Sequence, residues 1–188
     1  MGVVRVKCVL LGDSTVGKTA ITQAYHSDGT SFPKSYMMST GVDLLQKFVQ
    51  LGEDNKDVVD LFMFDSAGKE VFHQLNEASW DKVGMFVLVY DITNKTSFKN
   101  CQQWLKKIKQ FSEPGKSIPG VVIGNKGDLK DRREVEANEG NAFAVKHGLV
   151  FFECSAKQYE GIDVVFKHLA NEVHQLYQQS SENVQQIE

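Results

Sequence analysis

The sequence predicts a single α/β domain, and three observations support this fold class. The chain has 188 residues, 41% of them hydrophobic and 24% charged, which is typical of one globular domain. Short apolar runs typical of buried strands alternate with longer segments that can form helices. A glycine-containing segment, residues 12–19, joins the first strand to the first helix, as in proteins that bind phosphate groups.

Residues 12–19 read Gly-Asp-Ser-Thr-Val-Gly-Lys-Thr, the pattern G-x-x-x-x-G-K-T of a P-loop. Gly12 and Gly17 let the backbone curl, so that successive N–H groups point at one anion beside a helix N-terminus. Lys18 adds a positive charge for the β- and γ-phosphates, and the Thr19 hydroxyl suits Mg²⁺. The alternative is a chance glycine turn, which the Lys-Thr pair and the flanking strand and helix disfavour.

The first half of the chain predicts three strands, one helix and one long irregular segment. The expected strands cover residues 3–11, 42–51 and 58–64, and the expected helix covers residues 17–26. The last two strands are antiparallel neighbours joined by a polar turn. Pro33 and Gly41 keep residues 32–41 out of regular structure, and a connection of this length indicates function or mobility.

Asp65 follows the third strand directly and opens the sequence Asp-Ser-Ala-Gly-Lys-Glu. A carboxylate at the tip of an apolar strand can hold Mg²⁺, and Gly68 can offer its backbone N–H to a terminal phosphate. The pattern D-x-x-G is weak alone, and the preceding P-loop makes it a strong signal for a second phosphate-side site.

The second half predicts three further strands, three helices and a polar tail. The strands are expected at residues 85–90, from residues 121–123 onward, and at 149–153, and the helices at 96–111, 134–146 and 161–178. We expect Ala142, Phe143 and Val145 to face inward, and Phe72 and Trp80 to belong to the core. The domain then covers residues 1–178, and the tail at residues 179–188 is expected to fray.

A base-recognition pattern, N-K-x-D, occupies residues 125–128. The Asp128 carboxylate can accept hydrogen bonds from N1–H and the exocyclic amine of guanine, a donor pair that adenine lacks. Asn125 can bond the base edge and tie this loop to the P-loop, while the Lys126 stem can lie across the base. The alternative is a polar surface turn, in which these residue types are common. Ala156 follows the next strand and is small enough for its N–H to approach a base oxygen.

The motifs G-x-x-x-x-G-K-T, D-S-A-G, N-K-x-D and C-S-A-K, in this order, resemble those of the Ras-like small GTPases. The resemblance covers about residues 4–177. It implies a six-stranded, mostly parallel sheet with one antiparallel edge strand, helices on both faces, GTP/GDP binding and Mg²⁺. Tyr36 and residues 41–43 and 65–70 resemble the Rab branch. Residues 41–45, 65–70 and 174–177 look similar to its Rab-like intraflagellar transport family.

This resemblance carries the family's site residues onto the chain position by position. The implied nucleotide-binding residues are Gly12, Asp13, Ser14, Thr15, Val16, Gly17, Lys18, Thr19, Ala20, Phe32, Tyr36, Ser39, Gly68, Asn125, Lys126, Asp128, Ser155, Ala156 and Lys157. The implied Mg²⁺ ligands are Thr19, Ser39 and Asp65, and the implied catalytic residues are Lys18, Ser39, Gly68 and Lys69. Phe32 would pack on guanine and Tyr36 would close over the γ-phosphate. Ser39 stands where the family has threonine, and Thr40 can substitute if the register slips.

Lys69 departs most from the family, which usually has glutamine there to orient the attacking water. A charged lysine has three donors and no acceptor, so it cannot accept a hydrogen bond from that water. The sequence therefore predicts slow intrinsic GTP hydrolysis.

The resemblance also implies partners and a location. It implies a small β-sandwich subunit of the intraflagellar transport complex, together with an exchange factor, an activating protein and an effector. The expected location is cytoplasmic, in the cilium or flagellum. No cysteine follows Cys154, so we expect no prenyl anchor. Two alternatives stay open: a structural subunit whose nucleotide is a folding cofactor, and a conventional vesicle-trafficking Rab.

Composition disfavours several other functions. The net charge of −3 gives no reason to expect a nucleic-acid partner. The three cysteines and five histidines lack metal-ligand spacing, and we expect the cysteines to be reduced thiols. A small-molecule kinase would leave N-K-x-D unexplained.

Overall fold

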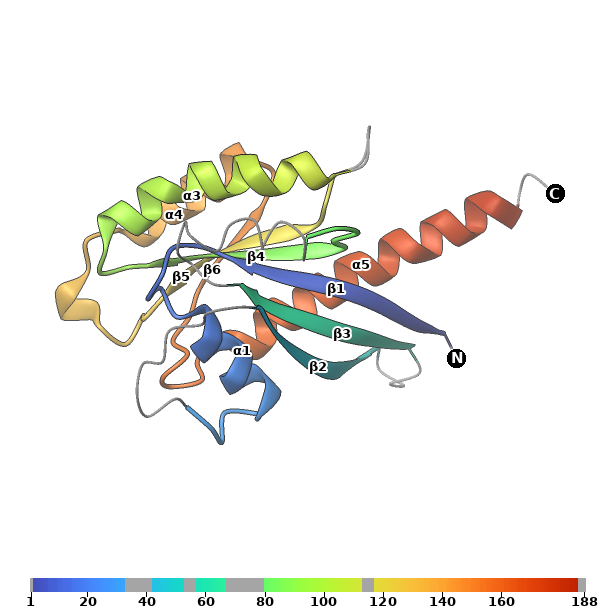
Figure 1. Ribbon diagram of the computed structural model, residues 1–188, viewed down its shortest axis with the longest axis horizontal. Helices are drawn as coiled ribbons and strands as arrows, with labels where there is room; N and C mark the ends of the chain where they lie inside the picture. Colours follow the sequence, from blue (N-terminus) through green and yellow to red (C-terminus); the bar gives the residue numbers. More distant parts are fainter. Residues whose placement is uncertain (1, 33–41, 53–56, 67–79, 113–116, 186–188) are drawn as a thin grey trace.

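One mixed sheet forms the centre of the molecule. The computed structural model describes residues 2–32, 42–52, 57–66, 80–112 and 117–185 (Figure 1). Its strands are β1 (Val3–Leu11), β2 (Val42–Leu51), β3 (Asp57–Ser66), β4 (Met85–Asp91), β5 (Gly120–Asn125) and β6 (Val150–Glu153). They lie in the order β2-β3-β1-β4-β5-β6, with β2 antiparallel to β3 and the other pairs parallel. The predicted sheet, with one antiparallel edge strand, is confirmed.

Helices cover both faces of this sheet. They are α1 (Lys18–His26), α3 (Lys95–Ile108), α4 (Ala137–Lys146) and α5 (Ile162–Gln185), with 3-10 turns at Lys109–Phe111 and Lys130–Arg132. Figure 1 shows α3 and α4 on one face and α1 and α5 on the other. No helix in the described part of the chain is long and apolar enough to cross a bilayer.

Two hydrophobic cores, one on each face, follow from the alternation of side chains along the strands. In β1, Cys8 and Leu10 pack in the core under α1 and α5, while Val9 and Leu11 pack in the core under α3 and α4. β4 and β5 are buried along their whole length, as their unbroken apolar sequences predict for central parallel strands. Trp80 is buried in the second core, which confirms its predicted place; Phe72 lies outside the described residues.

The predicted inward face of α4 is wrong at two positions. Ala142 is exposed and Val145 is 68% exposed, whereas Phe143 is half-buried against the second core. The buried positions are Gly140 and Ala144. An α-helix brings residues four apart onto one face, and Ala142 and Val145 lie off the face that these two define. The position of a residue around the helix therefore decides whether it is buried, more than its own hydrophobic character does.

The start of α4 and the end of α5 differ from the prediction. α4 begins at Ala137, not residue 134, because the backbone N–H groups of Glu134 and Val135 bond to Ile92 O and hold that segment against β4. α5 continues to Gln185, seven residues beyond the predicted end at residue 178. The added residues are polar except for Val184, but none is glycine or proline, and polarity alone does not stop a helix.

Candidate functional site

The loop between β1 and α1 adopts a backbone shape that only glycine permits at two positions. Gly12 has φ +136° and Gly17 has φ +103°, both in the range that L side chains rarely adopt. A Cβ on Gly12 would lie 2.2 Å from Val89 O, so the loop also passes too close to β4 for a side chain. The first N–H groups of α1 lack partners within the helix, which makes this curl a ready anion site.

Lys18, the first residue of α1, closes this loop on itself. Its side chain is buried, and its ammonium group donates to Gly12 O at 2.9 Å and to Asp13 O at 2.8 Å. Burial lowers the pKa of Lys18 to about 8, against the opposing effect of the carboxylates of Asp65 and Asp13. A positive charge that has lost most of its hydration is well placed to attract phosphate.

The end of β3 brings a carboxylate to the start of α1. The Thr19 hydroxyl donates to Asp65 Oδ2 at 2.5 Å, and Asp65 is buried. A hydroxyl and a carboxylate side by side are donors of the kind that Mg²⁺ takes, since this ion often binds one or two protein oxygens together with water and phosphate oxygens. These residues therefore fit the predicted ion. No cluster of three or more His, Cys, Asp or Glu in the described ranges offers another site.

Asn125, at the end of β5, joins three segments that are far apart in the sequence. Its Nδ2 donates to Val16 O at 2.9 Å, and its Oδ1 accepts from the Ala156 N–H at 3.2 Å. A Cβ on Gly17 would lie 2.3 Å from Asn125 Nδ2, so the P-loop packs directly on this side chain. The predicted tie between the two loops is present in the structure.

The other members of N-K-x-D are held by neighbouring loops. Ser155 Oγ donates to Asp128 Oδ1 at 2.7 Å, and the Gly127 N–H bonds to Cys154 O at 2.9 Å. Lys126 Nζ forms an ion pair with Asp91 Oδ2 at 2.6 Å. Because both side chains of the pair are at least two-thirds buried, at 31% and 8% exposure, the Lys126 stem is held in one place.

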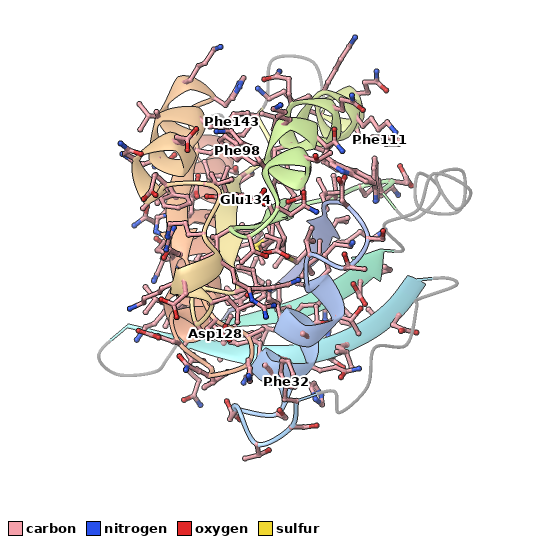
Figure 2. All side chains as sticks on the ribbon, turned by 90° about the vertical axis from the view of Figure 1, so that its left-hand side faces the viewer. Phe32, Phe98, Phe111, Asp128, Glu134 and Phe143 are labelled. Carbon is pink, nitrogen blue, oxygen red and sulfur yellow. The ribbon has the colours of Figure 1, made fainter. Side chains whose placement is uncertain are left out.

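These segments line one open pocket beside α1. Its lining residues are Gly17, Ala20, Phe32, Asn125, Lys126, Asp128, Leu129, Ala156 and Lys157. Figure 2 shows Phe32 and Asp128 at the same end of the molecule, near α1. An exposed aromatic ring, a carboxylate and a small residue around one hollow form a site of the shape and chemistry that a planar, hydrogen-bonding base requires.

Comparison with known proteins agrees with this geometry. The sequence profile of the Ras family matches residues 7–175.

The chain belongs to the Ras family.

Among its relatives in this family are proteins named intraflagellar transport protein 27 homolog. The one from Homo sapiens is 47% identical over 94% of both chains, and the one from Trypanosoma brucei brucei is 32% identical over 97% of both. Ras-related protein Rab-13 from Bos taurus is 35% identical over 89% of this chain and 79% of its own length. The chain is therefore a Rab-like member of the Ras family, similar to the intraflagellar transport 27 proteins.

Several predicted site residues of this Ras-family chain lie outside the described residues. They are Tyr36, Ser39, Thr40, Gly68 and Lys69. The structure brings the others into two adjoining groups, one on the P-loop and α1 with Asp65, and one around the pocket, formed by Phe32, Asn125 and the loops after β5 and β6.

Three further side chains hold this site, although no motif marks them: Asp91, Asn100 and Trp104. Asp91 is the last residue of β4, and the carboxyl ends of parallel strands are where α/β sheets bind ligands. Asn100 and Trp104 lie on α3, in a segment where the pattern predicts only an amphipathic helix. No short motif could have revealed them, because their contacts reach across 87 and 91 residues to Asp13.

Proposed function

We propose that this chain binds GTP and GDP, hydrolyses GTP slowly, and acts as a Rab-like subunit or switch of the intraflagellar transport complex in the cilium or flagellum. The observation that carries the nucleotide assignment is the contact at Asn125, which connects the P-loop, N-K-x-D and the loop at Ala156 around one pocket. The relatives from Homo sapiens and Trypanosoma brucei brucei, both named intraflagellar transport protein 27 homolog, support the assignment to intraflagellar transport.

In this proposal the pocket binds guanine and the P-loop binds the phosphates. Asp128 accepts from the two donors of the guanine edge, and Ser155, by donating to Asp128 Oδ1, keeps the carboxylate in place. Phe32 and the Lys126 stem lie on opposite faces of the base. Lys18 transfers its hydrogen bonds from the loop carbonyls to phosphate oxygens, and the backbone N–H groups of the loop bind the rest.

Thr19 and Asp65 would hold Mg²⁺, with Ser39 as a further ligand. When bound, the ion neutralises negative charge on the phosphates. Hydrolysis itself is a transfer of the γ-phosphoryl group to water, in which Lys18 stabilises the charge that develops on the phosphate oxygens. Lys69, in place of the glutamine that orients the water, supports slow turnover.

The first experiment identifies the ligand. Purified protein is denatured, the released small molecule is identified, and GDP, GTP and ADP are then titrated by calorimetry with Mg²⁺ present. We expect the released molecule to be a guanine nucleotide. We also expect the protein to bind GDP and GTP in the titrations and not to bind ADP. Failure of ligand-free, folded protein to bind either guanine nucleotide would overturn the proposal.

A second experiment tests slow hydrolysis. Lys69→Gln restores a side chain that can accept from water while donating to phosphate, so single-turnover GTP hydrolysis should become faster. Lys146→Gln, an exposed lysine of α4, is the matched control and should leave the rate unchanged. An unchanged rate in Lys69→Gln, or an ordinary Ras-family rate in the unaltered chain, would refute the role given to Lys69.

One observation also favours a second candidate, a structural subunit whose nucleotide stabilises the fold. Lys69 disfavours rapid cycling, and a protein that keeps its nucleotide needs no rapid cycle. In both candidates the expected partner is a small β-sandwich subunit of the same complex. Its affinity is measured for the GDP form and for a form with a non-hydrolysable GTP analogue. Unequal affinities support the switch, and equal affinities exclude a switch at that interface.

A further inference from the structure

Asp13, the second residue of the P-loop, directs its carboxylate away from the loop and towards α3. Asn100 Nδ2 donates to Asp13 Oδ2 at 2.7 Å, and Trp104 Nε1 donates to Asp13 Oδ1 at 2.8 Å. Each carboxylate oxygen therefore accepts from one side chain of α3. The backbone oxygen of the same residue accepts from Lys18. Asp13 thus connects α3 to the lysine that closes the loop.

The two donors sit on a rigid support. They are four residues apart on α3, so both project from one face of the helix. Trp104 is 6% exposed and packs in the second core. Asn94 begins the helix, and its side chain accepts from two N–H groups of the first turn. The burial of Trp104 and the cap on α3 restrain the positions of both donors.

The charge of Asp13 explains why such a support is needed. A carboxylate in a phosphate-binding loop repels the anion if it turns inward, because like charges in a partly buried site interact strongly. Two donors on α3 hold the carboxylate outward and offset part of its charge. The N–H groups of the loop then remain directed at the ligand.

We propose that Asn100 and Trp104 are positioning residues for nucleotide binding, acting through Asp13 to hold the P-loop in its anion-binding shape. The inference rests on the proposed function, since it concerns how tightly this loop retains a nucleoside diphosphate. It adds α3 to a site that the motifs confine to the loops.

The two tryptophans of the chain allow a matched test. Trp104→Phe keeps an aromatic ring but removes the N–H that Asp13 accepts. Trp80→Phe makes the same change in the neighbouring ring, whose Nε1 has no hydrogen-bond partner in the described ranges. We expect Trp104→Phe to release a fluorescent GDP analogue about ten-fold faster than the unaltered chain, because this is the effect of losing one hydrogen bond to a charged group. Trp80→Phe should release the analogue at the original rate.

Asn100→Leu is a second variant, in case the tryptophan change disturbs folding, and should accelerate release in the same way. Coupling separates positioning from general destabilisation. Asp13→Asn should accelerate release far less when it is made in the Trp104→Phe variant than when it is made in the unaltered chain. The reason is that both changes remove the same contact, between Trp104 and Asp13. Indole N–H signals in NMR spectra give an independent readout: Asp13→Asn should shift the signal that Trp104→Phe removes.

The outcomes distinguish nucleotide binding by this chain from the positioning role of Asn100 and Trp104. If the unaltered chain binds no guanine nucleotide, the proposed function fails. If it binds GDP but Trp104→Phe and Trp80→Phe release it at the same rate, or if the effects of Asp13→Asn and Trp104→Phe are additive, the inference about α3 is overturned while the proposed function stands.

Discussion

Several side chains of this site form hydrogen bonds to other parts of the protein, and these bonds hold the loops together without a ligand. Lys18 bonds to two loop carbonyls, and Asn125 bonds to Val16 and Ala156. Motif spacing could predict that these residues meet, because the P-loop and Asn125 both lie at the carboxyl ends of parallel strands, β1 and β5. It could not predict Asp91 as the partner of Lys126, since an aspartate at a strand end carries no pattern of its own.

The pKa of Lys18 makes nucleotide affinity depend on pH. Below its pKa of about 8 the free protein already carries the charge, so binding takes up no proton there. Above that pH the free lysine is neutral, while bound phosphates favour the charged form. Binding must then take up a proton, and affinity falls by up to about ten-fold for each pH unit. Calorimetry with GDP in buffers of different ionisation enthalpy measures this uptake, which should be absent on the acid side of the pKa.

Gly17→Ala should weaken nucleotide binding and lower stability. The new Cβ would meet Asn125 Nδ2 at 2.3 Å, and φ +103° is strained for alanine, together costing at least about 1–3 kcal/mol. Gly148→Ala is the control, because its φ of +70° is also strained but nothing lies within 4 Å of the added Cβ. Both variants should unfold at lower urea concentration, and only Gly17→Ala should lose GDP affinity. Equal GDP affinity in the two would contradict the close approach described here.

The positions of the strands could be predicted from the sequence, whereas the buried faces of the helices were harder to predict. An apolar run such as β4 indicates a central strand that is buried on both faces of the sheet. α4 is short and presents glycine and alanine to the core, so its composition gives little hint of its inward face. Gly140 is needed there because a Cβ would lie 2.5 Å from the hydroxyl of Tyr90 on β4.

That hydroxyl leads to a prediction about the packing of β4 on α4. Tyr90 is fully buried, and among the residues that the structure describes its hydroxyl has no hydrogen-bond partner. Burial raises the pKa of Tyr90, so the group is a neutral phenol that has lost its water. Tyr90→Phe removes this desolvated group and should raise stability by about 1 kcal/mol, or about 2–4 °C in Tm. A fall in Tm in differential scanning calorimetry would indicate a partner for the hydroxyl.

At the scale of the whole molecule, the site depends on a contact that no single element contains. Asn125→Asp replaces a donor with a carboxylate that faces Val16 O, so we expect a loss of about 1–3 kcal/mol in stability. Asn171→Asp is the matched control, because its amide donates to Lys167 O on the exposed side of α5. GDP should raise the Tm of the control as it does that of the unaltered chain, and should raise that of Asn125→Asp much less.

The contacts of Asn125 also fix the separation between the pocket proposed for the base and the P-loop proposed for the phosphates. The fixed separation favours a ligand whose two ends have the matching spacing. Such a ligand loses translational and rotational freedom once on binding, whereas guanosine and pyrophosphate added separately each lose it. We therefore expect this chain to bind whole guanine nucleotides more tightly than their separate fragments, even where every individual contact is the same.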